Sequence, residues 1–206
     1  MHNNLPQYPD FLLLMDHLKA YASPRAKLTQ MIKSGEIIKV RRGLYVWPPP
    51  ASWSLKTLAN KIYGPSYISF EYALSCHQMI PERVEMITCA SRAKNKSKTF
   101  TTPVGRFYYA SIPASVFPYG IMRQEAADGH FLIATPEKAL CDTLSKVSPP
   151  VTSLKGMSIL LYENLRLDAD ALASLQVRDL EFLAPLYRDK TVALFMKFFR
   201  KEIGHA

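Results

Sequence analysis

The chain has 206 residues, of which 48% are apolar and 21% charged, and its formal net charge is +9. This composition excludes wholesale disorder, and the length fits one large domain or a small module joined to a core domain. No apolar run approaches the roughly 20 residues that a membrane-spanning helix needs, so we expect no membrane partner.

The cysteines and the N-terminus indicate where the protein works. Cys76, Cys89 and Cys141 form an odd set without close spacing. Both a disulfide scaffold and a four-cysteine zinc site are therefore disfavoured. The first residues show no basic-then-apolar signal pattern. The expected location is the cytoplasm.

The positive charge is unevenly distributed along the chain. Residues 1–110 contain 15 basic and 6 acidic residues, whereas residues 111–206 contain 11 of each. Such asymmetry favours a polyanionic partner for the first half, nucleic acid before an anionic membrane surface. The alternative is that a basic surface only keeps the protein soluble.

Two helices are predicted at the start of the chain. Apolar residues recur at helical spacing between Asp10 and Tyr21. A second helix is expected from Pro24 to Lys33, because Ser23 can cap it and a proline suits the first helical position. Gly35 then provides a stop just beyond it.

The next elements are two short strands. Residues 36–40 and 44–47 are prone to form β-structure, and Gly43 permits the tight turn between them. The prolines at 48–50 end the second strand, so we place a module boundary near Pro50. The predicted domains are therefore residues 1–50 and residues 51–206.

The rest of the chain predicts a mixed α/β domain with a helical tail, which makes the whole protein α+β. The pattern gives the following elements: helices over residues 54–63, 69–79 and 135–147, strands over 84–90, 100–102, 106–112 and 131–134, and a mostly helical segment from Leu154 onward.

The order of two helices followed by a basic hairpin is that of a winged helix-turn-helix. The helix at 24–33 has an apolar face for packing and a polar face suited to a major groove. The polar face carries Arg25, Thr29, Gln30 and Lys33, with Lys27 at its border. In the hairpin, Lys39, Arg41 and Arg42 have the charge needed to hold phosphates.

A second basic segment follows the strand at 84–90. Arg92, Lys94, Lys96 and Lys98 alternate with small or polar residues, a pattern that suits phosphate contacts. The alternative is a solvated loop whose lysines oppose edge-to-edge strand pairing. Both interpretations remain open from the sequence.

Signals for an enzyme are weak. The histidines are scattered without metal-ligand spacing, and no glycine-rich phosphate loop is present. The cysteines lie in apolar stretches typical of inert core thiols. We therefore expect no catalytic residues, no metal and no cofactor.

Three blocks of sequence resemble one known family. The segment 32–46, IKSGEIIKVRRGLYV, resembles the helix-to-wing segment of AbiEi-like antitoxins of type IV toxin–antitoxin systems. The segment 63–75, YGPSYISFEYALS, and the segment 131–140, FLIATPEKAL, are similar to two further blocks of that family, in the same order.

The resemblance implies a bacterial transcriptional autorepressor that binds inverted repeats at its own promoter, for which a homodimer on DNA is one arrangement. It also implies a nucleotidyltransferase-like toxin as partner, antagonised without a stable complex. The family has no agreed catalytic residues.

Two other functions remain open. In the first, the C-terminal domain binds a toxin or effector, the basic half binds polyanions without specificity, and Phe195, Met196, Phe198 and Phe199 form a partner surface. In the second, an RNA-acting or nucleotide-modifying enzyme uses the basic half as a substrate track.

Overall fold

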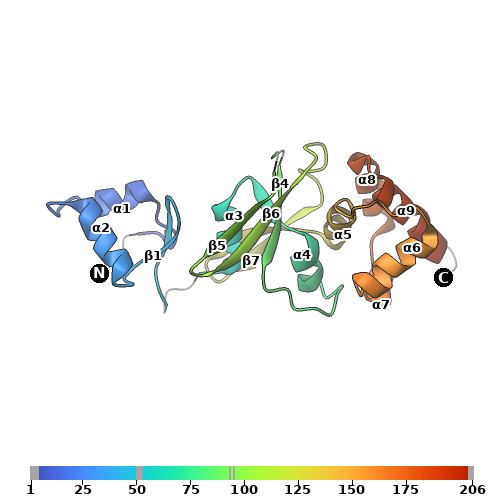
Figure 1. Cartoon of the computed structure of the whole chain (residues 1–206), viewed down its shortest axis with the longest axis horizontal. Coiled ribbons are helices and arrows are strands. Elements are labelled where there is room, and N and C mark those ends of the chain that lie inside the picture. The colour runs from blue at the N-terminus through green and yellow to red at the C-terminus, as the bar shows by residue number, and fades with distance from the viewer. Residues whose placement is uncertain (1–4, 50–52, 93, 95, 204–206) are drawn as a thin grey trace.

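The computed structural model describes residues 5–49, 53–92, 94 and 96–203. The N-terminal part forms a small module at one end of the elongated molecule (Figure 1). Its elements are α1 (Phe11–His17), α2 (Pro24–Lys33), β1 (Ile38–Arg41) and β2 (Leu44–Val46). Asp10 caps α1 by accepting from the Leu13 backbone N–H at 2.8 Å. Leu14 and Leu18 pack with Leu28 and Met31 in a small core that joins α1 to α2.

Strand β2 is buried on both faces. Tyr45 and the adjoining Trp47 pack in the small N-terminal core, whereas Leu44 and Val46 belong to the large core of the rest of the chain. Because successive side chains of a strand point to opposite faces, the hairpin lies between the two cores.

The centre of the molecule is a mixed six-stranded sheet with the order β5-β6-β4-β3-β8-β7. Its strands are β3 (Ser66–Ile68), β4 (Ile87–Arg92), β5 (Lys98–Thr102), β6 (Gly105–Ile112), β7 (Ile121–Ala126) and β8 (Gly129–Ala134). Helix α3 (Leu55–Ile62) covers one face, where the Tyr109 hydroxyl donates to the Ala59 carbonyl at 2.6 Å. Helix α4 (Phe70–Cys76) packs against β4 and α5.

The C-terminal helices form a layer beyond the sheet (Figure 1). They are α5 (Pro136–Leu144), α6 (Leu154–Ser158), the π-helical turn η1 (Ile159–Asn164), α7 (Ala169–Ala173), α8 (Val177–Tyr187) and α9 (Lys190–Ile203). Every residue of α5 from Glu137 to Leu144 is buried, its polar side chains included. The reason is its position between α4 on one side and α8 and α9 on the other.

The carboxylate of Asp128, in the β7–β8 turn, contacts residues on both sides of the junction between the N-terminal module and the sheet domain. Asp128 accepts hydrogen bonds from the Tyr8 hydroxyl, from the Ser54 backbone N–H at 2.8 Å and from the Thr57 hydroxyl at 3.0 Å. Tyr8 precedes α1, and Ser54 is the N-cap of α3. One side chain therefore holds the N-terminal segment and the start of α3 together.

The structure confirms an α+β protein with a mixed sheet, and helix α2 has the predicted bounds. Strands β3 and β7 were not predicted, and α1 ends at His17 instead of Tyr21. The predicted partner surface was wrong: Phe195, Met196, Phe198 and Phe199 are buried in the core. The boundary at Pro50 lies outside the described residues.

The role of Asp128 gives a first prediction. Asp128→Ala leaves three donors of the junction without their acceptor, so we expect a loss of about 1–3 kcal/mol in the free energy of unfolding. Urea denaturation followed by circular dichroism measures it. Glu125→Ala, which removes an exposed carboxylate from the same hairpin, is the control and should cost under about 0.5 kcal/mol. Equal losses in both variants would contradict the role.

Candidate nucleic-acid interface

The outward face of α2 carries the side chains that the sequence predicted for it. Arg25, Thr29, Gln30 and Lys33 are exposed, while Leu28 and Met31 on the opposite face are buried. Thr29 donates its hydroxyl to the Arg25 carbonyl at 2.9 Å, so only its lone pairs face outward. The face is therefore polar, accessible and basic.

Lys27 lies at the border of this face. It is half-buried, and its ammonium nitrogen lies 5.6 Å from the centroid of the Tyr21 ring. A cation over an aromatic face is weakly attracted to it and keeps its charge. Lys27 therefore adds positive charge at the start of α2, close to the segment that joins α1 to α2.

An irregularity in the hairpin divides its basic residues between two sides. Lys39 is opposite Tyr45 and Arg41 is opposite Leu44, so two steps on β1 match one step on β2. Such a bulge changes the direction of a side chain, and it places Arg41 on the side of Leu44, which faces the large core. Lys39 lies on the other side, with Tyr45. Arg42 is exposed in the turn, before Gly43 at φ +81°.

The position of Arg41 is supported by its electrostatic effect on β6. Burial raises the pKa of the Tyr109 hydroxyl, and the positive charge of Arg41 opposes that shift. Figure 1 shows the hairpin on the side of the N-terminal module that faces α3 and β5.

The second basic segment lies around the same aromatic residues. The ring of Tyr63 is 5.3 Å from that of Tyr109 and 5.7 Å from that of Phe100. The ammonium groups of Lys94 and Lys98 lie 5.2 and 5.1 Å from the centroid of Tyr63. The two lysines therefore lie over one ring of an aromatic cluster formed by Tyr63, Phe100 and Tyr109.

The loop is shorter than the four basic residues suggest: Lys94 and Lys96 lie between the two strands, and the first and last basic residues lie in them. Arg92 ends β4 and Lys98 begins β5, and both are exposed, as is Lys96 between them. Strand β5 is an edge strand of the sheet. Charged side chains on an edge oppose strand pairing with another chain, so this alternative role is compatible with the structure.

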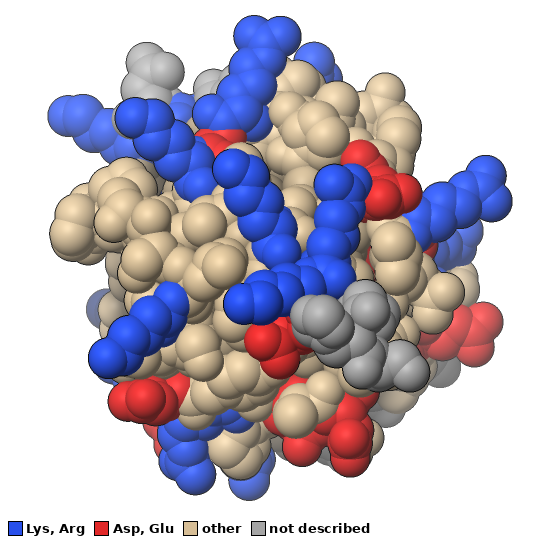
Figure 2. Space-filling view, turned by 90° about the vertical axis from the view of Figure 1, so that its right-hand side faces the viewer, with Lys and Arg blue, Asp and Glu red and all other residues tan. Residues whose placement is uncertain are grey.

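A further basic surface lies at the opposite end of the molecule. Figure 2 shows Lys and Arg side chains gathered across the upper and central part of the C-terminal face, with Asp and Glu mainly below them. Helix α9 exposes Lys190, Lys197, Arg200 and Lys201. Residues 111–206 contain equal numbers of basic and acidic residues, yet the basic side chains on this face gather apart from most of the acidic ones.

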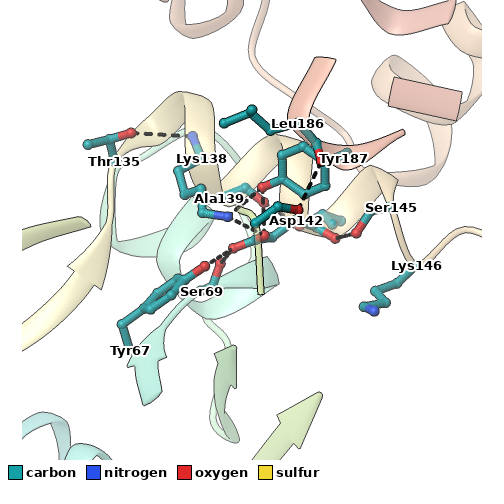
Figure 3. Close-up of polar contacts among 12 residues, drawn as sticks. Tyr67, Ser69, Thr135, Lys138, Ala139, Asp142, Ser145, Lys146, Leu186 and Tyr187 are labelled. Carbon is teal, nitrogen blue, oxygen red and sulfur yellow. Dashed lines mark hydrogen bonds and ion pairs between the residues drawn. The ribbon is translucent and has the colours of Figure 1, made fainter. Parts of the chain in front are cut away.

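The most connected polar cluster is buried beneath α5 (Figure 3). The Lys138 ammonium lies 2.9 Å from one Asp142 oxygen and donates to the Tyr187 hydroxyl at 2.7 Å. The other Asp142 oxygen accepts from Tyr67 at 2.9 Å and from Ser69 at 2.7 Å. Both charged side chains are fully buried.

The role of this cluster is structural. Burial lowers the pKa of Lys138, and the Asp142 carboxylate opposes that shift. Burial also raises the pKa values of Tyr67 and Tyr187, as does the nearby Asp142 charge. Because its charged atoms do not reach the surface, the cluster can link α5 to β3 and α8 but cannot contact a substrate from solution.

This cluster was not predicted from the sequence. Lys138 and Asp142 are four residues apart, a spacing at which charged pairs usually stabilise an exposed helix face. Nothing in that spacing indicates burial. The signal that was available is the cap and proline at Thr135 and Pro136, which locate the helix but not its surroundings.

The cysteines differ in exposure. Cys89 and Cys141 are buried, and burial raises their pKa values, whereas Cys76 is exposed, contrary to the expected core position. Within the described residues, no group of three His, Cys, Asp or Glu side chains could hold a metal ion. In the same part of the chain, no helix is long and apolar enough to cross a membrane.

Comparisons with known proteins give a likeness of fold. No family model matches the chain, and no curated protein matches it. The crystal structure of the RV2827C protein from Mycobacterium tuberculosis is similar, with a TM-score of 0.60 and 12% sequence identity. The alignment covers 98% of this chain and 77% of that chain, so it includes both the N-terminal module and the sheet domain.

The buried cluster gives a second prediction. Lys138→Met leaves the Asp142 carboxylate buried without its counter-charge, so we expect a loss of about 3–5 kcal/mol in the free energy of unfolding. Lys155→Met, at an exposed lysine of α6, should cost under about 0.5 kcal/mol. Urea denaturation of both variants provides the comparison.

A double-mutant cycle separates the pair from other effects. Lys138→Met combined with Asp142→Leu should cost less than the sum of the two single substitutions, by more than about 1 kcal/mol, because neither charge is then left alone. Additive losses would mean that the two groups are not energetically coupled.

Proposed function

We propose that the protein is a sequence-specific DNA-binding repressor that reads double-stranded DNA with α2. The observation that carries the proposal is the exposed polar face of α2, which lies beside a basic hairpin in a module with its own small core. Arg25 and Gln30 are side chains able to pair with base edges, and Lys33 is suited to phosphate.

The dimensions of α2 support this role. Its 10 residues span about 15 Å, and a major groove about 12 Å wide accepts one helix of this kind. In a winged helix-turn-helix the hairpin contacts the backbone beside the reading helix. Lys39 and Arg42 suit that contact.

The aromatic cluster suggests how the contact surface is extended. Lys94 and Lys98 lie over Tyr63, which packs with Phe100 and Tyr109, so phosphate contacts can continue from the hairpin onto the sheet domain. On this proposal Arg92 and Lys96 add longer-range attraction. These contacts position the protein but carry no sequence information.

The resemblance to AbiEi-like antitoxins supports a more specific proposal. The protein would repress its own promoter through inverted repeats, as a homodimer on the DNA. It would act as the antitoxin of a type IV system against a nucleotidyltransferase-like toxin, without a stable complex. Its place of action would be the cytoplasm.

One observation favours a second candidate, binding of a protein partner by the C-terminal domain. A groove of about 330 Å³ lies between α8 and α9, with Ala184, Pro185, Ala193 and Met196 in its wall. Lys197 and Arg200 are at its rim, and Arg200 forms an ion pair with Glu181 at 2.9 Å. A stoichiometric partner that co-purifies without DNA would favour this function.

The decisive experiment is fluorescence anisotropy with the DNA upstream of the protein's own reading frame and with a scrambled duplex, over a salt series. We expect the upstream DNA to be preferred by about a hundredfold, roughly 3 kcal/mol, at near-physiological salt. Equal binding that falls steeply with salt would contradict base reading and leave only polyanion attraction.

The hairpin gives a further prediction. Arg41→Ala combined with Arg42→Ala should weaken binding to both duplexes equally and flatten the salt slope by up to about two contacts. Lys155→Ala combined with Arg178→Ala, two exposed positions on the C-terminal helices, is the control with the same change in charge.

Gln30→Ala provides the contrast to the arginine pair. This substitution should narrow the gap between the upstream and scrambled duplexes by about 1–3 kcal/mol and leave the salt slope unchanged, because a neutral base contact releases no counterion. An unchanged slope in the Arg41 and Arg42 variant would rule out the hairpin contact.

A further inference from the structure

The central sheet has an opening between β3 and β8. These parallel strands share one residue pair, Ile68 opposite Ile133. Toward their N-terminal ends, at Ser66 and Phe131, the two strands are no longer paired with each other. A sheet normally separates its two faces, so the lack of pairing creates a passage that side chains from both faces can line.

The exposed backbone of β8 in this opening is paired by a side chain. The amide oxygen of Asn60 accepts from the Leu132 backbone N–H at 2.6 Å, and its nitrogen donates to the Leu132 carbonyl at 3.4 Å. An amide offers the same donor and acceptor as a peptide group. Asn60 of α3 therefore occupies the place of the missing neighbour and leaves space beside it.

That space is a pocket of about 340 Å³ with walls from both faces of the sheet. Thr57 and Lys61 line it from α3. Phe117 lines it from the segment between β6 and β7, Arg123 from β7 and His130 from β8. Phe117 is held in place by the ring of Tyr67, whose centroid is 5.3 Å away. The volume lies at the lower end of the range for small-molecule sites, roughly 300–1,000 Å³.

One polar atom in the wall lacks a partner. Ser66 is 5% exposed, and its buried hydroxyl has no hydrogen-bond partner among the residues that the structure describes. Ser66 is on the same side of β3 as Ile68, which faces α3, so its side chain lies on the pocket side. An unsatisfied buried hydroxyl is unfavourable, and a ligand that bonds to it removes that cost.

The charge of the pocket is positive. Lys61, Arg123 and His130 contribute basic groups, and none of the residues that line the described pocket is acidic. Two carboxylates lie nearby: Asp128 is engaged by the Thr57 hydroxyl, and Glu125 is opposite His130 in the β7–β8 register. Lys61 places its ammonium 5.0 Å from the centroid of Tyr8, so it is already near the junction of the modules.

We propose that this pocket binds a small aromatic anion, a planar ring that carries one phosphate or carboxylate group. The ring lies between Phe117 and Phe131, the Ser66 hydroxyl bonds to a polar atom of the ring, and the anionic group is held by Lys61 and Arg123. The volume fits a ligand of the size of a mononucleotide. This inference is independent of the function proposed above.

The test is ligand-observed NMR followed by isothermal titration calorimetry on the full chain. The probes are the four common ribonucleoside 5′-monophosphates for the phosphate source, and 4-hydroxybenzoate and indole-3-acetate for the carboxylate source. Inorganic phosphate and adenosine supply the anion and the ring alone. We expect at least one aromatic anion to bind with a dissociation constant below about 1 mM.

Three variants connect that binding to the pocket. Lys61→Gln combined with Arg123→Gln should weaken binding at least tenfold, while Arg106→Gln, at an exposed arginine of β6, should leave it unchanged. Ser66→Ala should weaken binding and leave the thermal midpoint of the free protein unchanged or higher, because no bond is lost. A structural hydroxyl would lower that midpoint instead.

Several outcomes overturn the proposal. These are no binding by any of the six aromatic anions, binding that is insensitive to Lys61 and Arg123, and equal affinity for inorganic phosphate alone. A lower thermal midpoint in the Ser66→Ala variant overturns the assigned role of that hydroxyl.

Discussion

The burial of both faces of β2 is the constraint on which the arrangement of this protein depends. Tyr45 and Trp47 complete the small core of α1 and α2, and Leu44 and Val46 extend the large core. A strand with two buried faces has one permitted register, because a slip of one residue would exchange the two sets of side chains. The two cores therefore share the hairpin, and the bulge in β1 places Arg41 opposite Leu44, on the side of the large core.

The same junction organises the charged surface. Asp128 fixes Tyr8 and the start of α3, and α3 leads into Tyr63, the ring over which Lys94 and Lys98 lie. The same helix, α3, therefore joins the contact to the N-terminal segment to the ring beside the lysines near β5. Under the proposed function, a DNA duplex would be met by both modules at once.

Local signals in the sequence were sufficient for some elements. Ser23 with Pro24 and Thr135 with Pro136 each mark a helix start, and both α2 and α5 begin there. Gly43 marks the turn of the hairpin, where its positive φ is required. The exposed basic face of α2 also follows directly from the spacing of Leu28 and Met31.

The remaining features depend on tertiary context that spacing does not reveal. Strand β3 has only three residues after Gly64 and Pro65, and β7 contains three consecutive polar residues, so neither shows a clear alternation of apolar and polar side chains. The pairing of Lys138 with Asp142 is typical of a surface helix, but α5 is enclosed on all sides. The bulge at Arg41 and the unpaired Ser66 hydroxyl arise from packing between distant segments.

The side chain of Asn60 has a consequence for solubility. A strand with open backbone groups invites a strand from another molecule, and an opening inside a sheet is as vulnerable as an outer edge. The Asn60 amide pairs with the backbone N–H and carbonyl of Leu132, so these two groups of β8 are not free to pair with a strand of another molecule. The sheet can thus contain a pocket without exposing unpaired strand backbone on which other chains could aggregate.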